Sequence, residues 1–425
     1  MATDTPLGPS PTLLTASARS ARSVVLVLLA GSLLLKAGGF AWDYLSYYVA
    51  TGTGHGTAAA GAALTVFGIG WCLGQAGSGL LTDRIGQRTA LIVLMLLSAA
   101  ACFALALARS LPALLAVALL LGMTMEAHRP AVSAAINDAI DTDAGRTRAQ
   151  AMLFWSANLG IAVCGGAGGY IAHHHGYRGL FLANGVVCLA FAVVARRTLS
   201  ARPPAAEHQA RTVTYRQVLA DPALRWIGLG AVFAMICAWG LVSVLPLLMT
   251  SDGLPPTAYG TAMIANTVSV LLLTPPMMRF LVGRGEQLKY PLAPILAAGS
   301  AVLGLGITVA AVQHTTLGYS IAAAILVPGE ICYSVAVGAF ISTAAPAGAT
   351  GRYQAVLSAA GAIASLPPLG IALALDAGGR VLVAALLGLC ALVAVAACRP
   401  LDRALRSADR PVHAAVRSPN SQEAP

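Results

Sequence analysis

The sequence predicts an all-α integral membrane protein whose twelve membrane-spanning helices form two six-helix pseudo-repeats. Three observations lead to this prediction. The 425-residue chain is 57% apolar and only 10% charged, whereas a soluble domain carries about 25% charged residues. Apolar segments of about 20 residues, long enough to cross roughly 30 Å of hydrocarbon, recur along the whole chain. A six-residue motif of the first half also returns in the second half.

Each apolar segment is expected to form an α-helix, because unpaired backbone polar groups are costly in lipid. A strand barrel is excluded because the segments are continuously apolar and do not alternate. The first segment follows two arginines, as a secretory signal does, but it is longer than the usual signal core of about 7–15 residues. The expected spans are 23–49, 58–81, 89–108, 112–136, 149–172, 179–196, 225–249, 258–280, 290–311, 317–343, 353–375 and 379–398.

Lysine and arginine near helix ends mark the cytoplasmic side of a membrane protein. With the N-terminus inside, all but five of the 26 lysine and arginine residues fall in inner loops or tails. Three fall outside (Arg109, Arg178 and Arg380), and two fall within the membrane (Lys36 and Arg129). Both termini are therefore expected in the cytoplasm. The net charge of +10 reflects this topology and does not indicate nucleic-acid binding.

Two polar stretches divide the chain into parts. The motif RAQAML at 148–153 returns as RYQAVL at 352–357, each time at the start of a glycine-containing helix. Two related halves are the economical explanation. The expected parts are a cytoplasmic tail 1–22, a six-helix bundle 23–196, a cytoplasmic linker 197–224, a second six-helix bundle 225–398 and a cytoplasmic tail 399–425.

The loop after the second span carries the sequence GLLTDRIGQR at 79–88. Its pattern G-x-L-x-D-R-x-G-x-R resembles the signature of the major facilitator superfamily, which lies in the cytoplasmic loop between the second and third helices. Gln87 departs from that signature, because a basic residue is common there. The resemblance implies the two-bundle fold of this superfamily and secondary transport of a small solute by alternating access.

Other segments resemble the bacterial proton-coupled drug-efflux, or multidrug-resistance, members of the superfamily. They include 128–141 and the glycine-rich stretch 158–169, where Cys164 and Gly165 replace the Gly-Pro pair usual in exporters. The resemblance implies proton-driven export of hydrophobic, drug-like or toxic compounds by an antiporter, and with it antibiotic resistance. An importer or sugar-efflux carrier of the same fold is the alternative. A polytopic membrane enzyme or a sensor is the alternative from another class.

We expect the 79–88 loop to act as a cytoplasmic gate. Asp83 ends the second helix, and the eleventh helix begins near Arg352 with the positive end of its dipole toward the cytoplasm. An acid beside that end stabilises contact between the halves. Arg84 and Arg88 can pair with Asp138, Asp141 or Asp143, although the charges of the loop can also serve topology alone. The gating residues are Gly79, Asp83, Arg84, Gly86, Arg88 and Arg352.

Ionisable side chains within membrane helices are costly and mark functional positions. Lys36 and Asp43 share one face of the first helix, and Glu126 and Arg129 share one face of the fourth. Glu330 falls near the middle of the tenth helix. These five residues are the candidates for proton coupling, and Arg129 or Lys36 can hold Glu126 ionised. The alternatives are a permanent ion pair at Glu126, a packing role for Glu330 and a rim position in outer water for Asp43.

Aromatic and polar side chains are candidates for the lining of a substrate cavity, although helix packing or an interfacial belt explains them equally well. They are Phe40, Tyr47, Trp155, Asn158, Trp239 and Asn266. A largely apolar cavity suits amphiphilic drugs better than sugars. No phosphate-binding loop, metal-ligand cluster or set of catalytic acids is present in the sequence. We therefore expect no enzyme activity, metal or cofactor, and a proton gradient as the energy source. The expected partners are a small-molecule substrate, protons and the lipid of the plasma or inner cell membrane, with a monomeric chain.

Overall fold

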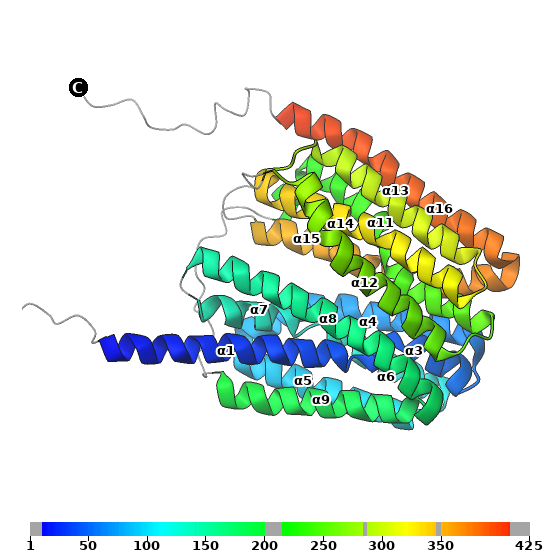
Figure 1. Cartoon of the computed structure of the whole chain (residues 1–425), viewed down its shortest axis with the longest axis horizontal. Coiled ribbons are helices and arrows are strands. Elements are labelled where there is room, and N and C mark those ends of the chain that lie inside the picture. The colour runs from blue at the N-terminus through cyan, green and yellow to red at the C-terminus, as the bar shows by residue number, and fades with distance from the viewer. Residues whose placement is uncertain (1–10, 141, 200–214, 284–286, 346–349, 409–425) are drawn as a thin grey trace, which may run out of the picture. The chain divides into compact units, whose positions relative to one another are not determined.

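The structure, a computed structural model, is built almost entirely of helices (Figure 1). It describes residues 11–140, 142–199, 215–283, 287–345 and 350–408, with only the backbone described at some of these positions. Among the described residues, nine helices are long and apolar enough to cross a membrane, and the apolar helix Leu111–Met125 is shorter. The expected number of twelve spans and the cytoplasmic termini stay predictions.

The chain divides into two compact units. The first unit consists of Met1–Gly54 and Val66–His208, and the second of His55–Thr65 and Gln209–Pro425. The sequence did not indicate that residues 55–65 group with the second unit. The hydroxyl of Thr65 explains part of this grouping, because it donates to the Leu366 carbonyl at 3.0 Å and accepts from the Leu369 amide at 2.9 Å. The domain limits expected from the sequence stay predictions.

Helices of very different length make up the first unit. Within it, α5 packs on α9, and α1 packs on α8. Buried apolar side chains such as Leu28, Leu91 and Phe191 fill the space between these helices. The elements are α1 (Pro11–Ala37), α2 (Phe40–Asp43), α3 (Leu45–Tyr47), the π-helix η1 (Tyr48–Gly52), α4 (Gly56–Ile85, shared with the second unit), α5 (Gln87–Leu107), α6 (Leu111–Met125), α7 (Arg129–Asp138), α8 (Asp143–His175) and α9 (Tyr177–Thr198).

Two spans of the first unit that the sequence predicts as continuous helices are interrupted. The first interruption, residues 38–39, separates α1 from α2 and consists of two glycines, which carry a high entropic cost in a helix. The second interruption, residues 126–128, separates α6 from α7. Pro130 accounts for it, because proline has no N–H for the carbonyl of Glu126 and its ring clashes with that carbonyl in a regular helix.

The second unit contains longer helices. In it, α13 packs on both α14 and α16, and α11 packs on α16. The last helix deviates from helical geometry at Gly379 (φ 63°, ψ −162°), so it joins two helices across a kink. The elements are α10 (Tyr215–Ala220), α11 (Pro222–Ser251), α12 (Pro256–Leu281), α13 (Leu292–Ala311), α14 (Thr316–Ala344), α15 (Thr350–Ile363) and α16 (Pro368–Ala408).

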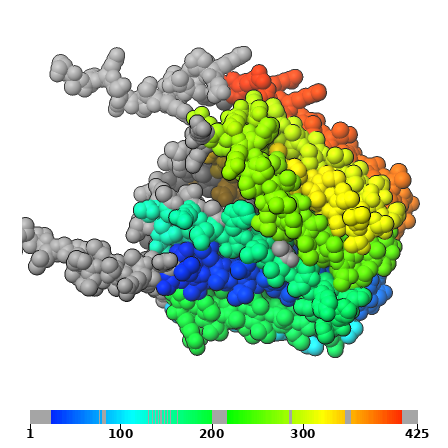
Figure 2. All heavy atoms as spheres, viewed as in Figure 1, coloured from blue at the N-terminus to red at the C-terminus, as the bar shows by residue number. Residues whose placement is uncertain are grey.

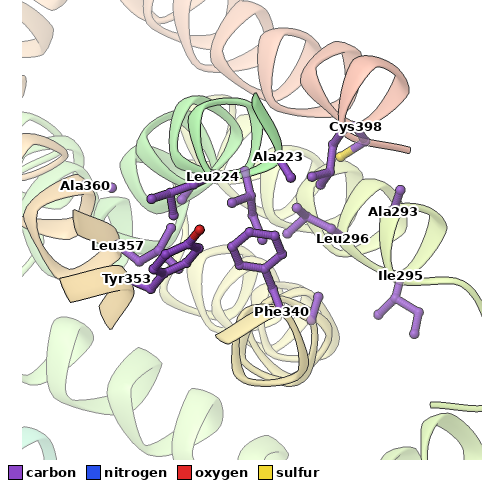
Figure 3. Close-up of a cluster of buried hydrophobic side chains, with 14 of the residues drawn as sticks. Ala223, Leu224, Ala293, Ile295, Leu296, Phe340, Tyr353, Leu357, Ala360 and Cys398 are labelled. Atoms are coloured by element: carbon purple, nitrogen blue, oxygen red, sulfur yellow. The ribbon is translucent and has the colours of Figure 1, made fainter. Parts of the chain in front are cut away.

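A buried cluster joins five helices of the second unit (Figure 3). Leu224 of α11, Leu296 of α13 and Phe340 of α14 meet Tyr353 and Leu357 of α15, and Cys398 of α16 completes the cluster. The Tyr353 hydroxyl donates to Asp221 at 2.6 Å, and Asp221 in turn caps the start of α11 by accepting from the Ala223 amide at 2.8 Å. The repeated motif at 352–357 therefore serves, at least in this half, to anchor α15 to α11.

The exterior of the second unit is rich in apolar side chains. Leu271, Leu272, Leu305, Leu317 and Ile321 are all exposed large hydrophobic residues. The space-filling view shows the side chains of α12 to α14 packed closely along a broad face (Figure 2). An apolar exterior over helices of this length suits contact with lipid and not with water.

Candidate functional site

The two interruptions of the first unit meet through their charged side chains. Lys36 stands one residue before the end of α1, and Glu126 is the first residue after α6. The ammonium of Lys36 donates to one carboxylate oxygen of Glu126 at 2.5 Å, and the guanidinium of Arg129 donates to the other oxygen at 3.3 Å. We call Lys36, Glu126 and Arg129 the membrane triad. The sequence indicated either cation as the partner of Glu126, and the structure brings both to it.

Close packing of α8 holds the lysine in place. A Cβ atom at Gly160 would lie 2.5 Å from Cβ of Lys36 and 2.8 Å from the carbonyl oxygen of Leu33. Only glycine therefore allows α8 to approach the end of α1 this closely. The Gln75 side-chain amide donates to the Glu126 carbonyl at 3.4 Å, which partly replaces the bond that Pro130 cannot make. The triad is thus held by four separate segments of the first unit.

The membrane triad carries more positive than negative charge, since two cations face one carboxylate. The side chains of Lys36 and Glu126 are 26% and 16% exposed, whereas that of Arg129 is 61% exposed. His128, in the turn between Glu126 and Arg129, is 6% exposed, and its Nδ1 has no hydrogen-bond partner among the described residues. The second interruption therefore combines an excess cation with an unsatisfied buried polar atom.

Asp43 lies inside the first unit, so its expected alternative as a rim residue in outer water is wrong. It is buried, and the thiol of Cys164 donates to its carboxylate at 3.0 Å. The reason is the short helix α2, which the first interruption turns against the glycine-rich part of α8. There the hydroxyl of Tyr44 donates to the Gly165 carbonyl at 2.7 Å. Sequence reasoning noted Cys164 only as a departure from the exporter pattern and missed its contact with Asp43.

Glu330 and Asn266 come together in the second unit. Asn266 of α12 is buried, donates to the Ala323 carbonyl of α14 at 3.1 Å and hydrogen-bonds to Glu330 through its side chain. The sequence assigned these two residues to different roles, one to proton coupling and one to the substrate cavity. Both roles stay predictions.

The remaining cavity candidates have different surroundings. Phe40 and Tyr47 are buried within the first unit, where Trp155 is exposed and Asn158 is half-buried on α8. Trp239 is half-buried on α11 of the second unit. A shared cavity for these side chains stays a prediction.

The expected gate is described in part. Gly86 has φ 78° and forms the turn between α4 and α5, a conformation that glycine adopts without strain. Arg84 is exposed, and Arg88 donates to the Arg196 carbonyl at the end of α9 at 2.6 Å. The side chains of Asp83, Asp138, Asp141 and Asp143, and the surroundings of Gly79, lie outside the described residues, so the pairing of Asp83 with the helix end near Arg352 stays a prediction.

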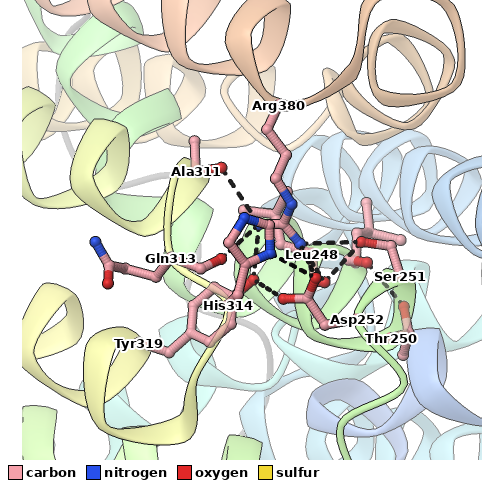
Figure 4. Close-up of polar contacts among 10 residues, drawn as sticks. Leu248, Thr250, Ser251, Asp252, Ala311, Gln313, His314, Tyr319 and Arg380 are labelled. Atoms are coloured by element: carbon pink, nitrogen blue, oxygen red, sulfur yellow. Dashed lines mark hydrogen bonds and ion pairs between the residues drawn. The ribbon is translucent and has the colours of Figure 1, made fainter.

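A second polar cluster, which sequence reasoning missed, lies in the second unit (Figure 4). Arg380 donates to Asp252 at 2.6 Å, to the Tyr319 hydroxyl at 2.9 Å and to the carbonyls of Leu248 and Gln313 at 3.1 and 2.7 Å. Asp252 also accepts from Tyr319 at 2.7 Å and contacts Nδ1 of His314 at 3.0 Å. We call Asp252, His314, Tyr319 and Arg380 the Arg380 network. It ties the end of α11 to α14, α16 and the loop after α13.

Comparison with known proteins identifies the fold. The family model of the Major Facilitator Superfamily matches residues 26–366. No match to a curated protein was found. Among solved structures, the POT-family transporter PepTSo superposes with a TM-score of 0.73 and 14% identity over 91% of this chain and 98% of its own. A POT-family transporter in complex with 5-aminolevulinic acid gives a TM-score of 0.67 and 16% identity over 90% of this chain and 95% of its own.

These matches bear on the expectations from the sequence. Together with the apolar helices, they confirm a helical, multi-pass membrane transporter, and a transporter family is consistent with the expected lack of enzyme activity. Both matched structures named above are described as POT-family transporters, so they lend no support to the drug-efflux subtype. The family model covers far more than half of the chain. The chain belongs to the major facilitator superfamily.

Proposed function

We propose that the chain is a proton-coupled secondary transporter of a small organic solute, and that it takes the solute up. The membrane triad carries this proposal, because it places one carboxylate between two cations where two membrane helices are interrupted. Discontinuous helices with charged side chains near mid-membrane are typical of substrate and coupling-ion sites in secondary transporters. Uptake is favoured over the expected drug export because the matched solved structures include transporters described as peptide carriers.

Glu126 can couple a proton to a solute through simple electrostatics. As a carboxylate, it offsets part of the charge of Lys36 and Arg129. When Glu126 takes up a proton, the two cations lose their shared counter-ion, and their repulsion is strong in a medium of low dielectric constant. Their separation, or the arrival of a negatively charged group, then lowers the free energy. Protonation of Glu126 therefore changes the affinity of the protein for the solute, and solute binding changes the affinity of Glu126 for a proton.

The sharpest test uses purified protein in liposomes with an imposed inward proton gradient. We would measure uptake of radiolabelled 5-aminolevulinic acid, dialanine and ethidium, together with the internal pH. We expect at least one of the two hydrophilic solutes to enter with protons. Glu126→Gln should abolish gradient-driven uptake but retain exchange of internal for external solute, because the amide keeps the shape of the site and cannot carry a proton.

A matched control is Asp402→Asn, which removes the half-buried acid of the Asp402–Arg406 pair of α16, whose side chains lie 2.9 Å apart. This variant should transport as the wild type does. Absence of proton movement with every solute would contradict the proposal. Ethidium leaving the liposomes in exchange for protons would instead establish the drug export that the sequence suggested.

A further inference from the structure

We infer that Cys102 and Cys188 form a dithiol site inside the first unit, which a lipid-soluble two-electron oxidant of the quinone class converts to a disulfide. The new bond would fasten α5 to α9. The inference goes beyond the proposed function and does not depend on it, because its test measures the covalent state and the stability of the protein and not transport.

The two thiols meet between neighbouring helices. Cys102 of α5 and Cys188 of α9 are 1% and 4% exposed, and their side chains are hydrogen-bonded to each other. Both helices are long and apolar enough to cross a membrane, and they lie side by side in the first unit (Figure 1). Next to the thiols, a Cβ atom at Gly185 would lie 2.5 Å from Cε1 of the Phe103 ring. The glycine therefore lets α5 and α9 approach closely at the level of the two sulfurs.

A second contact holds the sulfur of Cys188 in position. The side-chain amide of Asn184 donates to this sulfur at 3.7 Å, and the side-chain oxygen of Asn184 accepts from the Ala41 amide at 3.1 Å. Asn184 is itself 1% exposed. Ala41 belongs to α2, which also carries Asp43. One side chain therefore connects the thiol pair to the segment that follows the first interruption.

The apolar surroundings favour a reaction that creates no charge. Two S–H bonds break, one S–S bond forms, and the two protons and two electrons pass to the quinone, which becomes a hydroquinone. All reactants and products are neutral. A charged oxidant would have to lose its hydration to reach the buried sulfurs, whereas a quinone dissolves in the bilayer. Small side-chain rotations bring hydrogen-bonded sulfurs to the disulfide bond length of about 2.05 Å.

Another pair of cysteines provides an internal control. Cys237 of α11 and Cys390 of α16 are close enough to interact electrostatically. The thiol of Cys237, however, donates to the Leu387 carbonyl at 3.8 Å, so its proton is engaged with the backbone. Because this thiol is directed to a carbonyl and not to the other sulfur, we expect no disulfide between Cys237 and Cys390.

The test uses the whole purified protein in liposomes, treated with duroquinone, whose ring carbons all carry methyl groups and leave no position for thiol addition. Trypsin releases each of the two cysteines in a peptide of its own, 89–109 and 179–196. We expect mass spectrometry to find these peptides joined, and dithiothreitol to separate them. Ferricyanide, a charged oxidant, should leave them separate.

The second measurement is thermal unfolding of the same samples in detergent. The disulfide closes a loop between residues that stand 86 positions apart, so it restricts the unfolded chain. The midpoint of thermal unfolding should therefore rise by about 5 °C after treatment with duroquinone. Dithiothreitol should reverse the rise.

Serine variants supply the controls. Cys102→Ser and Cys188→Ser should each abolish both the linkage and the rise in the midpoint, whereas Cys237→Ser should keep both. Separate peptides after treatment with duroquinone, an equal yield of linkage between Cys237 and Cys390, or an unchanged midpoint in the linked protein would each overturn the inference. The decisive measurements are made on the wild type, so a serine variant that fails to fold does not affect the decision.

Discussion

The membrane triad of the first unit and the Arg380 network of the second are both built from a carboxylate and cations, yet they are satisfied to different degrees. Arg380 engages Asp252, a tyrosine hydroxyl and backbone carbonyls, and Asp252 has three partners in return. Glu126 has two cations, and Arg129 is 61% exposed and makes one hydrogen bond to the residues that the structure describes. A saturated network can only hold helices together, whereas an unsaturated one can exchange partners. This difference supports a structural role for the Arg380 network and fits the role in coupling that we propose for the membrane triad.

The largest effect is expected when the membrane triad loses its closer cation. Lys36→Met removes the contact at 2.5 Å and leaves Glu126 with the weaker Arg129 pair. Removing one partner of a buried pair costs about 3 kcal/mol, which corresponds to about a 100-fold fall in the population of the competent state. We expect a fall of that size in solute uptake by liposomes. If Lys36→Met takes up solute as fast as the wild type, the membrane triad has no role in transport.

A similar energetic cost but a different consequence is expected in the Arg380 network. Asp252→Asn leaves Arg380, which is 15% exposed, without its counter-ion. The free energy of unfolding should fall by about 3 kcal/mol, measured as a lower midpoint of thermal unfolding in detergent. Uptake per folded molecule and its dependence on pH should stay as in the wild type. A changed dependence of uptake on pH would show that the Arg380 network takes part in transport and is not only structural.

An intermediate effect is expected at the contact between α8 and the end of α1. Gly160→Ala places a Cβ atom 2.5 Å from that of Lys36, so α1 or α8 must shift. Overpacking of this kind costs about 1–3 kcal/mol. The shift displaces a member of the membrane triad. Solute uptake per folded molecule should therefore fall, in addition to the loss in the free energy of unfolding. Gly228→Ala is the control, since a Cβ atom there meets nothing within 4 Å.

A smaller effect is expected where the hydrogen-bond partner of Asp43 is a thiol. Cys164→Ala removes the donor at 3.0 Å and should lower the free energy of unfolding by about 1–2 kcal/mol. Cys164→Ser keeps a hydrogen-bond donor, so it should lower the free energy of unfolding by less. Equal stability of the alanine and serine variants would mean that the contact with Asp43 contributes nothing.

The smallest effect is expected at the periphery of the Arg380 network. His314 is 63% exposed, so its contact with Asp252 is weakened by water and salt. His314→Gln should change the free energy of unfolding, measured by thermal unfolding in detergent, by less than about 1 kcal/mol. A larger loss would show that the imidazole does contribute to the network.

Predictions from the sequence succeeded where the physical signal is local. Glu126 and Arg129 are three residues apart, so helical periodicity places them together, and the structure pairs them across the turn that follows α6. The apolar segments indicated membrane helices because their length matches the bilayer. The interruptions were not predicted, although Gly38, Gly39 and Pro130 signal them, because an apolar run continues past each interruption and dominates a reading based on hydropathy.

The sequence by itself determined the class of the protein. A chain so poor in charge and so rich in long apolar segments can satisfy its backbone only by forming helices in lipid. Tertiary structure alone decided that Asp43 meets Cys164 and that Asp252 meets Arg380. These pairs are separated by 121 and 128 residues. Periodicity within one helix sets which face a residue occupies, but the neighbour of that face depends on how the helices pack.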